Sequence, residues 1–446
     1  MEVRDPIHGA IGVSDDETAI VDDPYVQRLR GIKQMGFSEL PFPSAVHTRY
    51  AHALGAMELS GRAFDAVFRR DPFPPERRAV FRSLIRVAAL CHDLGHAPFS
   101  HCTEFAMPPL RALALDAYVP DLVADRLDLS ASHEDYTVLL LTRSPLAERI
   151  AGTFGFTGAH VAALVSREVR APDDLFIVDG RDYRRVLSQI ISSELDVDRL
   201  DYLVRDSYFS GARYGQVDVD WLLRNLEWHE DAASGDVSLA LDHRAIYAFD
   251  DYMIARFHMF MQVYFHHKSV VYEETLKRHF TGPSCQYSFP ADAPSYLPLD
   301  DIHLHAYLRA GVDEWCRRVS ERRPYRRALE LHGTPEEVDL TPTLARLADA
   351  GIDAMSATST GKLSRYAAMG RKRERAPSIW VVQRGPGQGV RAVPLESATR
   401  IFERYQDERH IARVYVPEER LAEAQRIARG GVVSGPSSRD PAGPRP

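Results

Sequence analysis

The chain has 446 residues, of which 45% are hydrophobic and 26% are charged, and its formal net charge is -8. This composition is typical of a soluble globular protein, and the length predicts about two or three domains. The high apolar content and the lack of a short sequence period exclude disordered, collagen-like and coiled-coil chains. The mildly acidic balance argues against a protein whose whole surface binds nucleic acid.

No run of about 18 or more apolar residues occurs, and the first residues, MEVRD, form neither a basic nor an apolar stretch. We therefore expect a cytoplasmic protein without a membrane-spanning segment. The four cysteines form no CxxC pair, so neither a disulfide framework nor a zinc site made of thiolates is expected. Histidine is the unusual residue type, because there are 18 and several occur at suggestive spacings.

The first 280 residues have mostly helical patterns. A Gly- and Asp-rich start predicts a short hairpin or loop, and Asp23 as N-cap with Pro24 at the first helical position predicts a helix after it. Apolar residues at three- and four-residue steps predict amphipathic helices over 49–67 and 79–91. The same pattern predicts helices over residues 134–170, 183–209, 218–227 and 246–278, with a strand at 237–241.

The pattern changes after residue 280. Four prolines between 281 and 302 predict a loop-rich connection, followed by helices over 303–320 and 341–350. Three strand-like runs, SIWVVQ, GVRAVP and IARVYVP, precede a last helix over 418–428. The sequence thus predicts a mostly α fold: a helical core over 1–280, a smaller α+β lobe over 281–429 and a disordered tail over 430–446.

The segment CHDLGHAPFSH, residues 91–101, follows an apolar run that predicts a buried helix. Burying His92 and Asp93 at its end requires partners, and for an isolated His-Asp dipeptide a hydrogen-bonded core pair is the commoner outcome. Here His96 and His101 follow, and the intervening Gly and Pro predict a tight turn that holds the imidazoles near one another. Neutral imidazole and carboxylate are ligands that suit a divalent first-row metal.

Two further segments offer ligands. His52 lies in the helix predicted for HTRYAHALGAM. On the helix predicted for ELDVDRLDYLVRD, three polar residues spaced four apart share a stripe with apolar residues: Asp198, Tyr202 and Asp206. Their neighbours Asp201 and Arg205 are expected to belong to a solvated charged face.

The ordered strings DPIHG, QRLRGIKQMG, HTRYAHALG, CHDLGHAPFSH and DVDRLDYLVRD resemble the HD-domain phosphohydrolases, and within them the deoxynucleoside triphosphate triphosphohydrolases. The resemblance runs from about Asp5 to Tyr264, with a weaker match around ARVYVPEE. An HD dipeptide alone is weak evidence, whereas five ordered motifs at this spacing are specific. The resemblance implies that the helical core is an HD domain.

The resemblance also implies a metal site made of two imidazoles and two carboxylates: His52, His92, Asp93 and Asp198. Such a site leaves positions for water and a phosphate oxygen, and the bound metal polarises phosphorus and activates water. The expected cofactor is one divalent transition metal (Mn, Fe, Co or Zn), with Mg as a further candidate at the substrate phosphates.

A second group matches residues around the reaction centre of the family: His96, His101, His133 and Glu104. His101 matches a histidine thought to donate a proton to the leaving group at the α-phosphate, and Glu104 stands where relatives have an orienting aspartate. His133 matches a histidine close to the attacking or phosphate-bound side. Imidazole suits this chemistry because it titrates near neutral pH.

The substrate contacts transfer in the same way. Arg49 and Arg256 match phosphate-binding arginines, and Arg199 replaces a lysine beside the metal-binding aspartate, which keeps the charge but changes its geometry. Three residues match those that hold the deoxyribose and its 3'-hydroxyl: Tyr202, Asp206 and Gln34. Met35 and Tyr264 match residues that crowd the 2' carbon, where bulk disfavours a 2'-hydroxyl.

The resemblance therefore implies a homo-oligomer, a dimer or tetramer, that hydrolyses deoxynucleoside triphosphates at the α-phosphate to deoxynucleoside and tripolyphosphate. One alternative keeps the site but takes a ribonucleotide, a monophosphate or a nucleoside-pathway intermediate. The other is a non-catalytic nucleotide- or nucleic-acid-binding regulator. Nucleic acid is not the expected partner, because arginine groups such as 317–327 and 370–375 are usually solvated faces. The segment GPGQG, 385–389, is expected to be a turn between strands.

Overall fold

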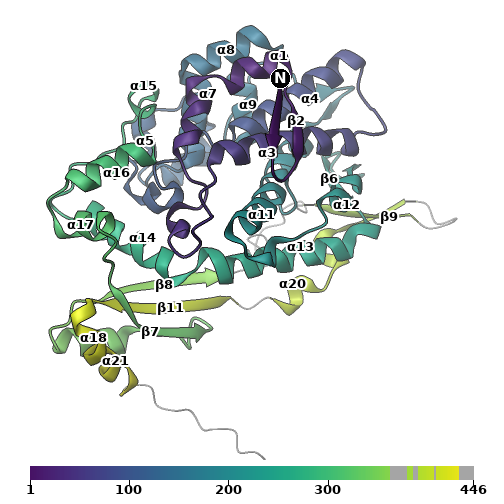
Figure 1. Ribbon diagram of the computed structural model, residues 1–446. Coiled ribbons are helices and arrows are strands. Elements are labelled where there is room, and N and C mark those ends of the chain that lie inside the picture. The colour runs from purple at the N-terminus through teal and green to yellow at the C-terminus, as the bar shows by residue number, and fades with distance from the viewer. Residues whose placement is uncertain (362–378, 385–389, 406–407, 431–446) are drawn as a thin grey trace, which may run out of the picture.

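The computed structural model describes residues 1–361, 379–384, 390–405 and 408–430. Figure 1 shows a body of packed helices with small sheets along its lower and right-hand sides, which confirms the predicted mostly α fold with a smaller mixed region. The segments 370–375 and 385–389 and the predicted tail from 431 onward lie outside the described residues. No helix of the described chain is long and apolar enough to cross a membrane.

The chain begins with the expected hairpin, in which β1 (Glu2–Asp5) pairs antiparallel with β2 (Gly9–Gly12). The carboxylate of Asp5 accepts hydrogen bonds from the backbone N–H groups of Ile7 and His8, both at 2.9 Å, which fixes the turn. Gly9 has a φ of 74°, a backbone conformation that favours glycine. The hairpin stands in front of α3 in Figure 1 and brings its turn toward the centre of the core.

Two long helices form the centre of the core, α3 (Arg49–Val67) and α4 (Pro75–Cys91), close to their predicted bounds. They pack side by side through small and apolar residues, among them the fully buried Ala53 and Leu84. The N-terminus of α3 and the C-terminus of α4 carry the residue motifs singled out above. Packing the two helices together therefore brings those motifs together.

Two of the long predicted helices are divided. Residues 134–170 form α7 (His133–Arg143), α8 (Pro145–Thr153) and α9 (Gly158–Val165). The first division follows from Pro145, because the residue before a proline avoids helical geometry and Ser144 instead caps α8. Residues 183–209 form α10 (Arg184–Ile191) and α11 (Val197–Ser210), and Asp196 caps α11.

Three other predicted helices also differ. The helix expected after Asp23 is only α2 (Pro24–Gln27), continued by the 3-10 turn η1 (Arg28–Gly31). Residues 218–227 form α12 (Val219–Arg224) and part of the strand β5 (Leu226–Glu230). Residues 246–278 form α13 (Ile246–Met259), a π-helical turn η7 (Phe260–Tyr264) and α14 (His267–Phe280).

The C-terminal strands divide between two sheets. SIWVVQ and GVRAVP form β9 (Trp380–Arg384) and β10 (Val390–Pro394), which extend the hairpin of β5 and β6 (Val237–Asp242) in the order β10-β9-β6-β5. IARVYVP forms β11 (Arg409–Val416), which lies between β7 (Arg326–Gly333) and β8 (Met355–Gly361). The predicted strands exist, but β9 and β10 belong to a sheet that begins in the helical core. The domain boundary at residue 280 stays a prediction.

The remaining elements are short. They are α1 (Asp15–Val21), η2 (Gly36–Glu39), η3 (Ser100–Ala106), α5 (Leu110–Leu113), α6 (Pro120–Val123), η4 (Ala124–Arg126), β3 (Ile177–Val178), β4 (Arg181–Asp182), η5 (Arg213–Gly215), η6 (His243–Ala245), α15 (Ala293–Tyr296), α16 (Asp301–Ala310), α17 (Glu314–Ser320), α18 (Thr341–Asp349), α19 (Leu395–Ala398), α20 (Ile401–Arg404), η8 (Glu418–Arg420) and α21 (Leu421–Arg429).

Candidate active site

The four predicted metal ligands lie together, brought by α3, by the end of α4 and by α11. His52 Nε2 lies 3.3 Å from His92 Nε2, 3.1 Å from Asp198 Oδ1 and 3.6 Å from Asp93 Oδ2. His92 Nε2 lies 3.4 Å from both Asp93 Oδ1 and Asp198 Oδ1. Donors about 2.0–2.2 Å from one ion are separated by roughly 3–3.6 Å, so the spacing of His52, His92 and Asp93 fits a single divalent cation, and Asp198 Oδ1 lies at such a distance from both imidazoles.

Hydrogen bonds at Nδ1 determine which nitrogen of His52 and of His92 carries the proton. His92 Nδ1 lies 2.7 Å from the backbone carbonyl of Ala89, which only accepts, so Nδ1 carries the proton. His52 Nδ1 donates to the carboxylate of Asp201 at 2.7 Å. Both Nε2 atoms of the neutral rings therefore direct lone pairs at one another and at the carboxylates, an arrangement that a cation between them stabilises.

The pKa values of His52 and His92 are both raised, so the surrounding carboxylates favour a positive charge at this site. Burial by itself would lower the pKa of His52, but hydrogen bonds to Asp198 and Asp201 raise it to about 10. Burial also opposes protonation of His92, yet Asp93 and Asp198 raise its pKa to about 8. The Asp198 side chain is 31% exposed, whereas His52 is fully buried, so the cluster opens on the Asp198 side.

Asp201 and Arg205 are not on a solvated face, and that prediction was wrong. Both side chains are fully buried, because α11 packs against α3 and the N-terminal hairpin covers them. Asp201 accepts hydrogen bonds from Arg205 Nε and Nη2 at 2.8 and 2.9 Å, and His8 Nε2 lies 2.6 Å from it. Arg205 also donates to Asp5 at 2.7 Å. This network holds His52 from behind.

Gly55 on α3 allows that network to lie so close to the helix. A Cβ atom at this position would overlap Asp201 Oδ1 and Arg205 Nη2. The absence of a side chain is therefore a steric requirement of the site.

A second cluster lies beside the first and contains the four residues that the resemblance assigns to catalysis. The rings of His96 and His133 stack with centroids 3.9 Å apart, and His101 lies edge-on to both. Glu104 bridges the group, because one carboxylate oxygen contacts His133 Nδ1 and the other lies 3.2 Å from His101 Nδ1. His96 Nε2 lies 3.3 Å from Asp93, which connects the two clusters.

Glu104 polarises the histidines that it contacts. Burial would raise the pKa of Glu104, but hydrogen bonds from His101 and His133 hold it well below its usual range. Burial would lower the pKa of His133, and the bond to Glu104 raises it instead. His96 is different, since burial, Arg49 and His133 all lower its pKa. The side chain of His101 is 64% exposed and is the member that a ligand reaches first.

The three predicted phosphate-binding arginines each contact a different carboxylate. Arg49 contacts the carboxylate of Asp93 through Nη1, and its Nε donates to Ser100 Oγ at 3.0 Å. Arg199 turns away from Asp198 and contacts Asp196, the cap of its own helix. Arg256 Nη1 donates to Glu194 at 3.2 Å. Arg49 is thus the arginine in direct contact with the metal-ligand cluster.

The predicted sugar-binding residues form a third group at the far end of the α11 stripe. The carboxylate of buried Asp206 accepts a hydrogen bond from Tyr264 at 2.7 Å, and His47 Nε2 lies 2.7 Å from its other oxygen. Gln34 hydrogen-bonds through its backbone to His47, and among the described residues its buried Oε1 has no partner. Tyr202, Tyr264 and Met35 are packed around the same core region. A buried amide oxygen without a partner suits a polar ligand.

Two family models match this chain: the HD domain over residues 49–206 and the HD-associated region over residues 217–344. The chain therefore contains an HD domain that is followed by an HD-associated region. The HD model spans His52, the His92-Asp93 dipeptide and Asp198, so the matched region holds the whole metal-ligand cluster.

Individual relatives of this HD-domain chain agree with the fold. Protein MJ1154 of Methanocaldococcus jannaschii is 28% identical over 340 residues, which cover 76% of this chain and 61% of that protein. The deoxynucleoside triphosphate triphosphohydrolase SAMHD1 homolog of Dictyostelium discoideum is 32% identical over 215 residues, 47% of this chain and 36% of that protein. The chain therefore spans less than two thirds of either relative. A crystal structure of a hypothetical protein from Aquifex aeolicus has the same fold, with a TM-score of 0.72 at 24% identity over 96% of this chain and 99% of that one.

Several residues of the HD-domain site were not predicted from the sequence: Asp5, His8, His47, Asp201, Arg205, Glu194 and Asp196. His47 and His8 lie inside quoted motifs, HTRYAHALG and DPIHG, so their place in these strings was a usable signal. Asp201 and Arg205 also lie inside a quoted motif, DVDRLDYLVRD, but they were interpreted as an exposed pair because a charged pair at helical spacing is typical of an exposed face.

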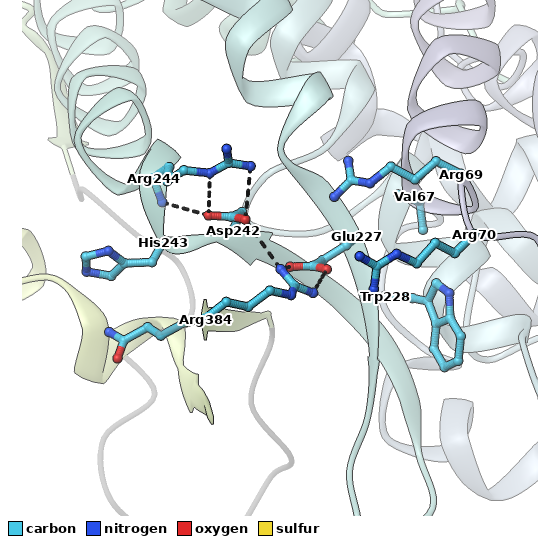
Figure 2. Close-up of a pocket in the computed structure, with 10 residues that line it drawn as sticks. Val67, Arg69, Arg70, Glu227, Trp228, Asp242, His243, Arg244 and Arg384 are labelled. Carbon is cyan, nitrogen blue, oxygen red and sulfur yellow. Dashed lines mark hydrogen bonds and ion pairs between the residues drawn. The ribbon is translucent and has the colours of Figure 1, made fainter. Parts of the chain in front are cut away.

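A separate cavity of about 860 Å³ lies between the end of α3 and the sheet of β5, β6 and β9. Figure 2 shows that its arginines are partly neutralised, since Arg384 pairs with Glu227 and Asp242, and Arg244 pairs with Asp242. None of its lining residues belongs to the clusters described above, so we do not assign it to the HD-domain reaction.

Proposed function

We propose that this protein hydrolyses deoxynucleoside triphosphates at the α-phosphate and releases a deoxynucleoside and tripolyphosphate. The observation that carries the proposal is the side-by-side arrangement of a four-ligand metal cluster, a histidine–carboxylate group and the Asp206–Tyr264 pair along α11. In the proposed complex the α-phosphorus lies at the metal and the sugar reaches Asp206, which is about two helical turns from Asp198 on α11. Its matching relatives include a protein named as a deoxynucleoside triphosphate triphosphohydrolase, over 47% of this chain.

In this proposal His52, His92, Asp93 and Asp198 hold one divalent transition metal, and the metal supplies Lewis-acid polarisation of the phosphate and activation of water. Arg49 lies against Asp93 and offers its guanidinium to an α-phosphate oxygen. Arg199 and Arg256 each have to exchange a carboxylate partner for phosphate, so substrate binding competes with their ion pairs to Asp196 and Glu194.

The histidine–carboxylate group supplies the proton that the leaving oxygen needs. His101 lies against Glu104, and this carboxylate offsets part of the lowering of the His101 pKa by burial, so a proton on His101 passes readily to the leaving group. His133, whose pKa is raised by the same carboxylate, holds Glu104 in place from the buried side. His96 is kept neutral by burial and by Arg49, which suits a hydrogen-bonding role without net charge.

Asp206 and Tyr264 supply sugar recognition. The Asp206 carboxylate is buried and accepts from Tyr264, so a 3'-hydroxyl that donates to it enters an already oriented pair. Met35 and Tyr264 take up the space beside the 2' carbon, and a 2'-hydroxyl there costs either a clash or a lost hydrogen bond. Cytoplasmic location and assembly into a dimer or tetramer are parts of the same proposal.

The test is a substrate panel on protein of measured metal content. We expect turnover of dATP or dGTP, weaker turnover of ATP, and no turnover of dAMP. Asp93→Ala and Asp198→Ala should lose bound metal and activity together, whereas the surface variant Asp220→Asn should keep both. Equal or faster turnover of ATP or dAMP would favour another nucleotide substrate. Tight nucleotide binding without turnover, unchanged in Asp93→Ala, would favour a non-catalytic regulator.

A further inference from the structure

A second cluster of metal-ligating side chains lies outside the active site, where the last turn of α14 meets the first turn of α17. His279 Nδ1 lies 2.8 Å from Asp313 Oδ2. Cys316 Sγ lies 3.4 Å from the same nitrogen and 3.3 Å from the same carboxylate oxygen. One imidazole, one carboxylate and one thiol therefore converge on a single point.

These separations are close to those around a tetrahedral zinc ion. Zinc lies about 2.3 Å from sulfur and about 2.0–2.2 Å from nitrogen or oxygen, so a sulfur and a nitrogen or oxygen on one zinc are roughly 3.5 Å apart. Both distances from Cys316 Sγ agree with this value within about 0.2 Å. Only the His279–Asp313 pair has to widen, by roughly half an ångström, to admit the ion.

The surroundings orient His279 for this role. The Tyr307 hydroxyl lies 3.2 Å from His279 Nε2 and accepts a hydrogen bond from the Gln286 backbone at 3.0 Å. When Nδ1 is the ligand, the proton on Nε2 therefore has an acceptor already in position, which is the usual outer-shell arrangement of a zinc-bound histidine. His279 and Cys316 are each only 1% exposed, whereas Asp313 is partly exposed and gives the ion an entry path.

A second thiol, that of Cys285, lies near this group of three. This partly exposed residue follows α14 and interacts electrostatically with both Cys316 and Tyr307. The ligands come from three places in the chain, with spacings of His-x5-Cys and Asp-x2-Cys. For that reason the cysteine spacing predicted no thiolate site: the two cysteines are separated by 30 intervening residues (286–315) and meet only in the fold.

We propose that His279, Asp313, Cys316 and Cys285 bind a structural zinc ion that ties α14 to α17. A closed site of four protein ligands contributes to folding rather than to catalysis. Loss of this zinc would also affect the active site, because α14 packs against two of its neighbouring segments. These are η2, which follows Met35, and η3, which contains His101 and Glu104. The zinc would thus anchor the helix that supports one wall of the substrate pocket.

The direct test uses cobalt as a spectroscopic replacement for zinc in the full-length protein. The active-site cluster contains only nitrogen and oxygen donors, so a thiolate-to-cobalt charge-transfer band in the near ultraviolet reports on the cysteine site alone. We expect this band with intense tetrahedral bands in the visible range, and their loss when zinc is added. They should persist in Asp93→Ala, which removes an active-site ligand. A cobalt-loaded wild-type protein without the charge-transfer band would overturn the proposal.

Variants then identify the ligands. Cys316→Ala and His279→Gln should each remove the tetrahedral spectrum and lower the zinc content by one ion per chain, and Cys285→Ala should weaken the charge-transfer band. Cys102→Ala and His303→Gln are matched controls that should leave the spectrum unchanged. An unchanged spectrum in Cys316→Ala would refute the assignment. If that variant does not fold, the wild-type spectrum and one zinc per chain in Asp93→Ala decide the question.

Discussion

Asp201→Asn tests whether the buried network behind His52 holds the metal ligand in place. The substitution keeps the size of the side chain but removes the charge that faces Arg205, His52 and His8. An amide accepts through one atom only, so its NH2 group faces one or more of these donors. Breaking a buried ion pair costs about 3–5 kcal/mol. For a cooperative core of about 280 residues this corresponds to a fall in melting temperature of roughly 5–8 °C.

The same change acts on the metal site. Removing the outer partner of a metal-bound histidine lowers metal affinity about 10–100-fold. The assay combines thermal unfolding of the metal-free protein with metal titration of the folded protein. The matched control is Asp220→Asn, which breaks the exposed pair with Arg62 and should cost only about 0–1 kcal/mol. If Asp201→Asn melts within about 1 °C of this control and binds metal equally well, the buried network neither stabilises the core nor orients His52 for metal binding.

Three further predictions follow from particular contacts. Gly55→Ala should unfold the protein or abolish metal binding, because the added Cβ overlaps Asp201 and Arg205. The control Gly152→Ala lies on exposed helix α8 with open space around it and should be neutral or stabilising by about 0.5–1 kcal/mol. Equal melting temperatures of the two variants would contradict this prediction. Glu104→Gln removes the carboxylate that supports a proton on His101 and raises the pKa of His133, so in profiles of kcat/KM against pH the loss of activity on the basic side should move to lower pH. An unshifted profile would argue against the role of Glu104. Tyr264→Phe should lower kcat/KM for dATP about 10-fold, which is roughly the value of one hydrogen bond to a charged group. The control Tyr247→Phe changes an exposed tyrosine and should leave kcat/KM unchanged. A loss of less than about twofold in Tyr264→Phe would show that this tyrosine does not take part in sugar binding.

The elements that carry the metal-ligand candidates were predictable because each lies in an uninterrupted helical pattern. Helix α3 begins at Arg49 and ends at Val67, close to its predicted bounds, and α4 ends at Cys91 as expected. The stripe of Asp198, Tyr202 and Asp206 follows directly from helical periodicity on α11. Local patterns of this kind need no knowledge of the rest of the fold.

The errors arose where a distant segment decides the environment. Asp201 and Arg205 have the spacing of an exposed ion pair, and only the N-terminal hairpin, about 200 residues away in the chain, buries them. The pairing of β9 and β10 with the β5–β6 hairpin also depends on a distant segment, and the sequence patterns made no prediction of strand pairing. The Ser144–Pro145 dipeptide is a sequence signal for a helix break, but the apolar periodicity continues across it and predicted one long helix.

In the proposed reaction, water attacks the α-phosphorus of a deoxynucleoside triphosphate and breaks its bond to the 5'-oxygen, so that deoxynucleoside and tripolyphosphate separate. Phosphorus NMR and mass spectrometry of the products formed from dATP in ¹⁸O-labelled water test it most directly. We predict unlabelled deoxyadenosine and intact tripolyphosphate that carries the label on a terminal phosphorus. Pyrophosphate with dAMP, or inorganic phosphate with dADP, would show that a different phosphorus–oxygen bond breaks and would refute the proposed function.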